Sequence, residues 1–110
     1  MYYLKKRLEV AGAHCLAHLN YDSKCKNLHG HNWIITVYCR SESLDQNGMI
    51  IDFTKIKSIV NQLDHAIIND FVDEPTAENI AKYLCDSIPY CYKIEVQESE
   101  NNLVIYEASD

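Results

Sequence analysis

Two histidines and a cysteine, Cys25, His29 and His31, lie close together in the stretch "CKNLHGH". Residues 29 to 39 are rich in β-forming side chains. Alternate side chains of a strand share one face, so His29 and His31 are expected to point the same way. Their Cα atoms would then be about 6.5 to 7 Å apart, which lets both imidazoles reach one ion. The stretch therefore predicts a metal site, a catalytic site, or both.

A third ligand must come from elsewhere in the chain. His14 follows the first predicted strand and lies beside His29 and His31 if the first two strands form an antiparallel hairpin. His18, inside the next loop, is the weaker candidate. Three neutral imidazoles with an open fourth position are typical of catalytic zinc. The alternative is a pair of histidines that only pack or are solvated where a strand begins.

Cys25 lies four residues before His29, between Lys24 and Lys26. Positive neighbours favour the thiolate, the form of cysteine that acts as a base or nucleophile. The same thiolate could instead be the fourth ligand of a closed structural site, and the spacing leaves both interpretations open.

Two carboxylates are further candidates for the site. Asp64 precedes His65, and a carboxylate beside an imidazole can tune it for proton transfer, although such neighbours are often a surface coincidence. Glu98 falls on the apolar face of a predicted strand, where it needs a partner with N–H donors, such as the edge of a guanidine-like heterocycle. Alternatively, that strand end emerges into water, because Ser99 and Glu100 follow.

The elements that position these residues begin with two strands. We expect the first over residues 2 to 11, followed by a bend at the small residues "AGAH". A polar loop is expected from residues 15 to 27, and the second strand covers residues 29 to 39. The stretch "DQNGM" then carries an Asn-Gly turn signal.

Two helices should follow this turn. The first begins after the N-cap Asp52; the second begins after the N-cap Thr76 and ends before Pro89. Their apolar stripes are Phe53, Ile56, Ile59, Val60 and Leu63 in the first, and Ala77, Ile80, Ala81, Leu84 and Ile88 in the second.

Residues 91 to 98 alternate again, and a last strand is expected over residues 103 to 107 after a polar turn. In the first of these strands the pattern predicts one face with Tyr92, Ile94 and Val96 and another with Lys93, Glu95 and Gln97. The order is β-β-α-α-β-β, so the fold class is α+β with a four-stranded antiparallel sheet. Cys39 and Cys85 occupy apolar positions and are expected in the core.

The composition limits the possible partners. The 110 residues suit one domain over 1–110, and the net charge of −6 argues against binding nucleic acid or an anionic membrane. No apolar run approaches the roughly 20 residues of a membrane-spanning helix, and the start of the chain lacks a signal-peptide core. Five cysteines without a CxxC pair fit reduced thiols, so a cytoplasmic protein is expected.

Six motifs together resemble the 6-pyruvoyl-tetrahydropterin synthase and 6-carboxy-5,6,7,8-tetrahydropterin synthase family. They are "GAHCL", "CKNLHGHN", "GMIIDF", "LDHAIIN", "PTAENIA" and "VQES", and they span nearly the whole chain in this order. Three residues between the cysteine and H-G-H look like the carboxytetrahydropterin synthases of queuosine biosynthesis. A branch with glutamate in place of the cysteine is disfavoured by Cys25.

The resemblance implies a role for each residue in the matching motifs. It implies zinc ligands at His14, His29 and His31, a catalytic Cys25, and a proton-transfer pair of Asp64 and His65. Glu98 would anchor the pterin ring. Thr76 is a further substrate-binding candidate, as are Lys24 and Lys26, which are assigned to the triphosphate because of their charge and their proximity to Cys25.

The resemblance also implies the tunnelling fold. In that fold three subunits join their strands in a barrel and two trimers stack as a homohexamer, with active sites between subunits. Closure would remove exposed sheet edges and help to stabilise so short a chain. The sequence departs from the usual pattern at Cys15, where arginine is frequent, at Val10, where an aromatic is common, and at Ser99, where threonine often follows the glutamate.

The implied activity is the zinc-dependent conversion of 7,8-dihydroneopterin triphosphate to 6-carboxytetrahydropterin, acetaldehyde and triphosphate. The same scaffold could instead form a pyruvoyl product or act as a dihydroneopterin side-chain lyase. A non-catalytic, zinc-stabilised oligomer that binds pterin is a third possibility, although a structural site needs neither Asp64 and His65 nor Glu98.

Overall fold

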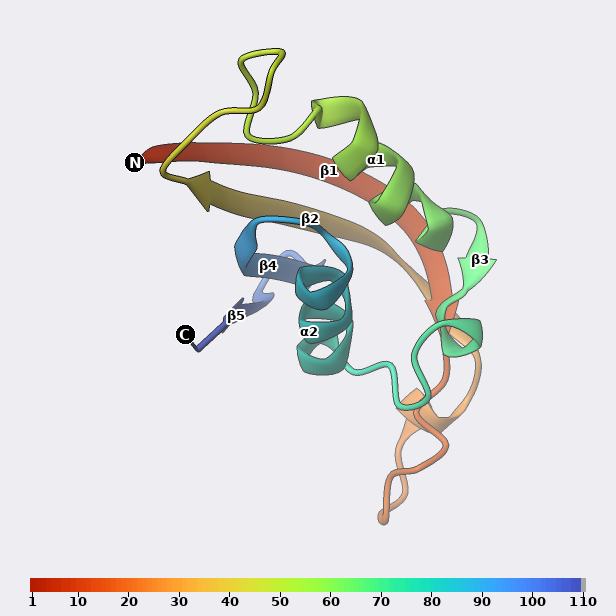
Figure 1. The fold of residues 1–110 in the computed structure, drawn as a ribbon. Helices are drawn as coiled ribbons and strands as arrows, with labels where there is room; N and C mark the ends of the chain where they lie inside the picture. The colour runs from red at the N-terminus through yellow and green to blue at the C-terminus, as the bar shows by residue number, and fades with distance from the viewer. Residues whose placement is uncertain (110) are drawn as a thin grey trace.

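The protein folds as one sheet with two helices packed against it. A computed structural model describes residues 1–109 (Figure 1). The strands are β1 (Tyr2–His14), β2 (His29–Ser41), β3 (Ala66–Ile67), β4 (Cys91–Ser99) and β5 (Asn102–Glu107), and the helices are α1 (Phe53–Val60) and α2 (Ala77–Ser87). Short 3₁₀ turns cover Lys24–Lys26, Asn61–Leu63 and Ile68–Asp70. The strand order is β3-β1-β2-β4-β5.

The α+β class is confirmed, with both helices between the second and third long strands. The four long strands pair in antiparallel fashion as predicted. The prediction of a purely antiparallel, four-stranded sheet is wrong, because β3 adds a short parallel pairing to β1 at Gly12 and Ala13. A two-residue strand carries no alternating pattern, so the sequence gives no signal for it.

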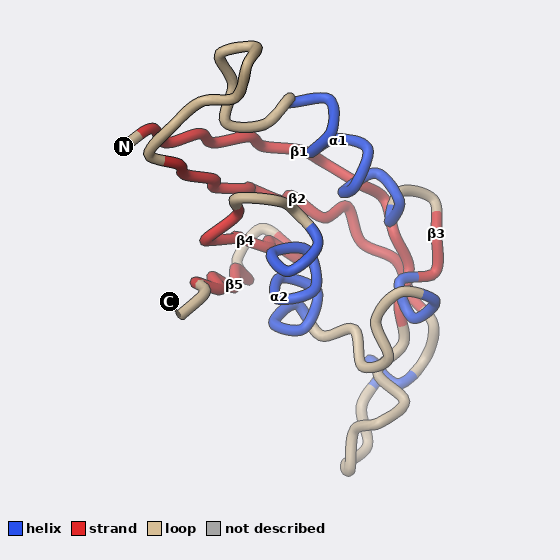
Figure 2. The backbone as a smooth tube through the Cα atoms, viewed as in Figure 1, coloured by secondary structure: helices blue, strands red, loops and turns tan. Residues whose placement is uncertain are grey.

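The first strand does not end before "AGAH", contrary to the prediction. β1 continues through His14 and pairs with β2 along its whole length (Figure 2). A Cβ atom on Gly12 would lie 2.9 Å from the carbonyl oxygen of Leu63 and 3.1 Å from Ile68 Cδ1. The small residues therefore allow close approach of the chain after α1, and do not end the strand.

Both helices begin where the sequence predicts. Asp52 Oδ1 accepts a hydrogen bond from the backbone N–H of Thr54 at 2.8 Å, and Thr76 Oγ1 accepts one from Asn79 at 3.1 Å. These side-chain caps satisfy N–H groups that have no partner within the helix. The cap at Thr76 fixes where α2 begins. It thereby also fixes the position of the preceding "EPT" segment, residues 74–76, which passes beside His14.

The core lies between the helices and one face of the sheet. Its fully buried members include Trp33, Ile35 and Val37 from β2 and Ile56, Ile80 and Leu84 from the helices. The expectation that Cys39 and Cys85 belong to this core is confirmed, since they are 0% and 5% exposed. No helix in residues 1–109 is both long enough and apolar enough to span a membrane.

Tyr92 does not share the apolar face of β4, contrary to the prediction. The β2–β4 register shifts so that Tyr38 pairs with Lys93 and Cys39 pairs with Cys91, which leaves Tyr92 as the extra residue of a β-bulge. Its ring contacts Tyr38 on the face opposite the helices. A bulge breaks strict alternation, so a period-two pattern misplaces the residue within it.

Candidate metal centre and active site

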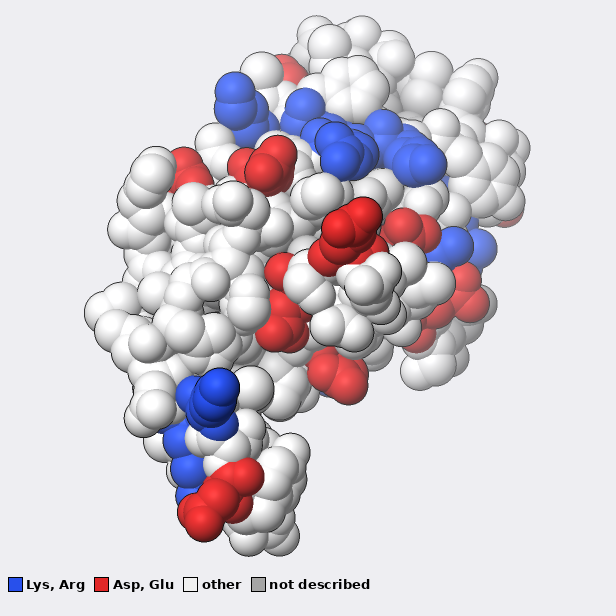
Figure 3. All heavy atoms as spheres, turned by 180° about the vertical axis from the view of Figure 1, so that it is seen from behind, with Lys and Arg blue, Asp and Glu red and all other residues white. Residues whose placement is uncertain are grey.

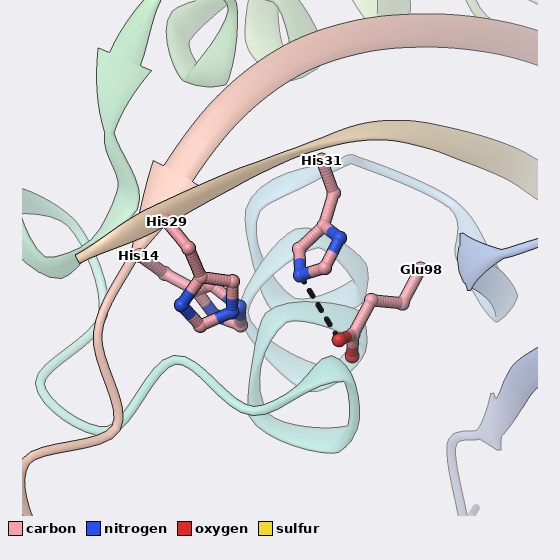
Figure 4. A group of neighbouring side chains, drawn as sticks. All are labelled: His14, His29, His31 and Glu98. Carbon is pink, nitrogen blue, oxygen red and sulfur yellow. Dashed lines mark ion pairs between the residues drawn. The ribbon is translucent and has the colours of Figure 1, made fainter. Parts of the chain in front are cut away.

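Three histidines converge where β1 ends and β2 begins. His14 and His29 are directly paired across the two strands, and His31 lies two residues further on the same face of β2. Glu98 of β4 points into the same space (Figure 4). One ligand atom from each of the four residues lies within 4.8 Å of the others, which is close enough to surround one ion.

Backbone carbonyls orient two of the imidazoles. His14 Nδ1 donates to the carbonyl oxygen of Pro75 at 2.7 Å, and His29 Nδ1 donates to that of Asn27 at 2.7 Å. A ring that donates through Nδ1 leaves Nε2 with a free lone pair when it is neutral. Metal-binding histidines are commonly held in this way, so the two carbonyls prepare Nε2 of both rings as ligands.

The remaining polar atoms of the cluster also fit a metal ion. His14 Nε2 and His31 Nε2 are buried and have no hydrogen-bond partner. His31 Nε2 lies 3.0 Å from Glu98 Oε1, a contact that is an ion pair only when the imidazole is protonated and whose geometry is not that of a hydrogen bond. Buried nitrogens without partners are costly, and a bound cation would satisfy both.

The protonation of the cluster favours ligation too. Burial lowers the pKa of His14 and of His31 below the ordinary histidine value, although the Pro75 carbonyl and Glu98, respectively, act in the opposite direction. Both rings are therefore neutral near pH 7. Only a neutral imidazole has a lone pair to give to a metal.

Two supports of the cluster were not found from the sequence. Trp33 stacks edge-on against His14 and His31, with ring centroids 4.9 and 5.0 Å away, and is fixed by a hydrogen bond from its Nε1 to the Gly12 carbonyl. Asn69 holds the backbone of Cys15, accepting from its N–H and donating to its carbonyl at 3.0 Å each. Asn69 is the last residue of the "LDHAIIN" motif, but the sequence analysis assigned no role to it.

Cys25 lies beside the histidine cluster. A cavity of about 230 Å³ is lined by Lys24, Cys25, His29, His31 and Glu98. The converging ligand atoms include those of Glu98 and not the sulfur of Cys25. This arrangement gives no support to a closed site of one cysteine and three histidines, and Cys25 lines a space that a ligand can enter.

Asp64 and His65 lie at the same end of the sheet but outside that cavity. Their side chains form an ion pair of 3.6 Å, and the imidazole is 84% exposed. His65 lines a second cavity of about 440 Å³, and His31 lines both this cavity and the one beside Cys25. Within one chain, the pair and Cys25 are therefore not brought together.

The backbone of this pair is held firmly. Asp64 Oδ1 accepts a hydrogen bond from the N–H of Ala11 at 2.8 Å, and the N–H of His65 donates to the Ala11 carbonyl at 2.6 Å. His65 has a φ of 55°, a left-handed conformation that is strained for a residue with a side chain. Backbone strain that is maintained by surrounding hydrogen bonds is common at functional sites. Here the left-handed conformation directs the exposed imidazole of His65 outward.

The other substrate-binding candidates lie less centrally. The Thr76 hydroxyl caps α2, whose next residues Ala77 and Glu78 line a further cavity together with Glu98. Lys24 lines the Cys25 cavity, whereas Lys26 is not among its lining residues. Of these candidates, Lys24 has the most direct access to the histidine cluster.

Comparison with known proteins agrees with this geometry. The 6-pyruvoyl tetrahydropterin synthase family matches residues 3–109. The chain is 31% identical to a 6-carboxy-5,6,7,8-tetrahydropterin synthase from Synechocystis sp., covering 90% of this chain and 88% of the relative. It is 30% identical to a 6-pyruvoyl tetrahydrobiopterin synthase from Dictyostelium discoideum, covering 76% and 73%.

Solved structures give the same answer. The structure of Caenorhabditis elegans 6-pyruvoyl tetrahydropterin synthase matches with a TM-score of 0.73 and 27% identity, covering 98% of this chain and 96% of that one. The fold and the site define a tetrahydropterin synthase type of protein. The chain belongs to the 6-pyruvoyl tetrahydropterin synthase family, a family of tetrahydropterin synthase enzymes.

Proposed function

We propose that the protein is a zinc-dependent 6-carboxy-5,6,7,8-tetrahydropterin synthase. It would convert 7,8-dihydroneopterin triphosphate and water to 6-carboxytetrahydropterin, acetaldehyde and triphosphate, as in queuosine biosynthesis. The supporting observation is the convergence of His14, His29 and His31 beside a cavity that also holds Cys25. Similarity to a relative named for this activity over most of both chains favours it further.

We assign the metal to Nε2 of His14 and His29, whose Nδ1 atoms are occupied by carbonyls, and to Nε2 of His31. A zinc ion bound there would act as a Lewis acid on the oxygens of the substrate side chain. The lowered pKa values of His14 and His31 keep these rings available at neutral pH.

Glu98 is assigned to the pterin ring. A carboxylate can accept two parallel N–H bonds from a guanidine-like edge, and such charge-assisted pairs are strong. Its position beside the histidines would hold the ring so that the side chain of the substrate reaches the metal. Lys24 lines the same cavity and is assigned to the triphosphate, with Lys26 and Thr76 as additional contacts.

Cys25 is assigned the proton transfers at the substrate side chain, because it lines the cavity beside the histidines. His65, oriented by Asp64, would carry the opposite transfer. Since one chain does not bring these groups together, we propose that the Asp64–His65 pair acts in a site completed by another subunit. A homohexamer built as a dimer of trimers would provide this arrangement.

The test is a product analysis. Purified, zinc-loaded protein is incubated with 7,8-dihydroneopterin triphosphate, and the products are identified by mass spectrometry with a trap for acetaldehyde. Carboxytetrahydropterin and acetaldehyde are the expected products. A product that retains the three-carbon side chain would assign the pyruvoyl activity instead, and side-chain cleavage that leaves the ring unreduced would assign a lyase.

A complete lack of turnover would overturn the enzymatic proposal. If zinc and pterin still bound under those conditions, the protein would be a zinc-stabilised pterin-binding oligomer. Equilibrium sedimentation of the same sample tests the proposed hexamer independently of catalysis.

A further inference from the structure

Two thiols that take no part in the proposed reaction face each other across β2 and β4. Cys39 lies directly opposite Cys91 in the register of these antiparallel strands, and both are free cysteines. The Cα atoms of such cross-strand partners are about 4.5 to 5.5 Å apart, which lies within the range of about 4.4 to 6.8 Å that a disulfide spans. The pair is reduced, but its backbone spacing is that of a disulfide.

The β-bulge at Tyr92 is what brings the two thiols together. Cys39 is fully buried on the face of β2 that packs against the helices. In a regular ladder Cys39 would pair with Tyr92, and Cys91 would lie on the other face with Lys93. Because the bulge adds one residue, Cys91 instead lies opposite Cys39 and packs against the core. Arg40 alternates to the other side of the sheet, where Figure 3 shows a row of Lys and Arg side chains.

The sulfur atoms of Cys39 and Cys91 are also in contact, and they are not equivalent. The contact with Cys91 lowers the pKa of the Cys39 thiol, although burial acts in the opposite direction. The same contact, together with burial, raises the pKa of Cys91. A thiol that donates to a neighbouring sulfur stabilises the thiolate there. Cys39 is therefore the nucleophile of the pair, and Cys91 is the partner that keeps its proton.

A third thiol lies close to the pair but is less suited to a bridge. Cys85 Sγ donates a hydrogen bond to the carbonyl oxygen of Cys91 at 3.7 Å. Burial raises the pKa of Cys85 to about 12, so this thiol stays protonated at neutral pH. Within residues 1–109, the sulfurs of the three cysteines do not converge as ligand atoms of one ion. The arrangement therefore favours oxidation of Cys39 and Cys91 over metal binding.

We propose that Cys39 and Cys91 form a disulfide when the protein is exposed to a peroxide. Cys91 is partly exposed at the start of β4, which gives so small a molecule a route to the sulfurs. The Cys39 thiolate attacks one peroxide oxygen and the O–O bond breaks, which leaves a sulfenic acid on Cys39 and releases the other oxygen as water. The Cys91 sulfur then attacks the sulfenic sulfur, the S–O bond breaks, and the hydroxyl leaves with the Cys91 proton as a second water. The two thiols lose two electrons in total, and the peroxide accepts them.

The disulfide joins β2 to β4 at a distance from the histidine cluster. At about 3.3 Å per residue, Cys39 is roughly 26 Å along β2 from His31. The bridge closes residues 39–91, a loop that contains both helices, and closure of a long loop restricts the unfolded chain. Both sulfurs belong to the core of one chain, so the bridge does not depend on how subunits assemble. It is a redox-sensitive link that is separate from Cys25.

The test treats the purified protein with hydrogen peroxide, blocks the remaining thiols and maps disulfides by mass spectrometry. Cleavage after lysine and arginine leaves Cys39 in residues 27–40 and Cys91 in residues 83–93, so the bridge joins these two peptides. The variant Cys91→Ala should lose the joined peptide, whereas the matched control Cys85→Ala should retain it. The oxidised protein should also unfold at a higher guanidinium concentration than the reduced protein, and Cys91→Ala should lose this shift.

Exposed Met49 reports whether the peroxide treatment was sufficient. It is 44% exposed and is converted to the sulfoxide without any opening of the core. The proposal is overturned if Met49 is oxidised and no joined peptide forms, if the bridge lies within residues 83–93, or if it links two chains on a non-reducing gel. It is also overturned if the folded protein gives the same mixture of pairings as protein oxidised in guanidinium, because the fold would then not select the pair.

Discussion

The two ends of β2 place different ligand-forming side chains on the same face of one strand. His29 and His31 lie at its start, and Cys39 lies ten residues after His29. Further residues of the same type lie near each end of β2. His14 lies beside the two histidines, and Cys85 and Cys91 lie near Cys39. Imidazole and thiolate are both strong ligands for zinc, so composition alone would nominate both ends.

Only the histidine end has the properties of a metal site. Within residues 1–109, the histidines with Glu98 are the one group whose ligand atoms converge. At the other end, the thiols of Cys39, Cys85 and Cys91 donate to carbonyl oxygens at 3.5 to 3.7 Å. Burial raises the pKa of Cys85 to about 12. The contact with Cys39 and burial also raise the pKa of Cys91, whereas the contact with Cys91 lowers the pKa of Cys39. All three cysteines lie in the core or against it and act as small core residues.

The contrast shows that the direction of the lone pairs decides function more than the residue type does. Carbonyl oxygens take the Nδ1 protons of His14 and His29 and leave Nε2 free toward a shared space. At the cysteine end, carbonyl oxygens accept hydrogen bonds from the sulfurs themselves, and within residues 1–109 the sulfurs do not converge as a group of ligand atoms. The following predictions test this difference.

The largest effect is expected at the histidine end. His29→Ala should abolish metal binding and turnover, because it removes a ligand whose ring is already oriented; the affinity loss should exceed the roughly 10- to 100-fold cost of losing an outer-shell partner. Metal content by atomic emission spectroscopy measures this. His18→Ala, an exposed histidine of the adjacent loop, is the matched control and should retain the metal. Equal metal loss in both variants would contradict the assignment.

Cys25→Ala should lower kcat by about 10² to 10⁴-fold, the usual contribution of a positioned acid or base. The metal should stay bound, since the cysteine sulfur is not among the converging ligand atoms. Steady-state kinetics and metal content are measured on the same sample. Loss of zinc together with activity would reassign Cys25 as a ligand.

Glu98→Gln replaces one acceptor oxygen with a donor group. Substrate binding should weaken by about 10- to 100-fold, which corresponds to the loss of a hydrogen bond to a charged group. Fluorescence titration with a pterin that is not turned over measures the affinity directly. Because Glu98 lies 3.0 Å from His31, metal affinity is determined in parallel. A variant with unchanged pterin affinity and weakened metal binding would make Glu98 a fourth ligand.

At the cysteine end, Cys39→Ala should lower the free energy of unfolding by about 1 to 2 kcal/mol, because it leaves a small cavity at a fully buried position. Metal content should not change. The control Cys15→Ala lies at a half-buried position beyond β1 and should alter stability by less, about 0.5 kcal/mol. Guanidinium unfolding gives both values, and metal loss in Cys39→Ala would remove the distinction between the two ends.

The smallest effect concerns pH. Burial lowers the pKa of His14 and His31, so below the ordinary histidine pKa of about 6.5 the unfolded chain takes up protons that the folded protein does not. The free energy of unfolding of the metal-free protein should therefore be constant just above this pH and fall as the pH drops toward the folded-state pKa values. Unfolding curves between pH 8 and 5 with a chelator present measure this. Stability that is flat down to pH 5 would contradict it.

Much of the fold could be predicted because local signals agree with it. Asp52 and Thr76 cap the two helices as expected, and the period of two from His29 to Cys39 gives the correct buried face. The errors fall where tertiary contacts override local pattern. The bulge turned Tyr92 to the other face, and β1 continues through Gly12 to His14, where the end of the strand was expected earlier.

For the site, the sequence by itself supplied the residue types and the shared face of His29 and His31, because these depend only on spacing along one strand. Tertiary structure alone decided that the carbonyls of Pro75 and Asn27 would orient the rings and that Glu98 would join them. It also decided that Asp64 and His65 would lie outside the Cys25 cavity of their own chain. Such relations join residues far apart in sequence, and their geometry depends on packing that no local pattern encodes.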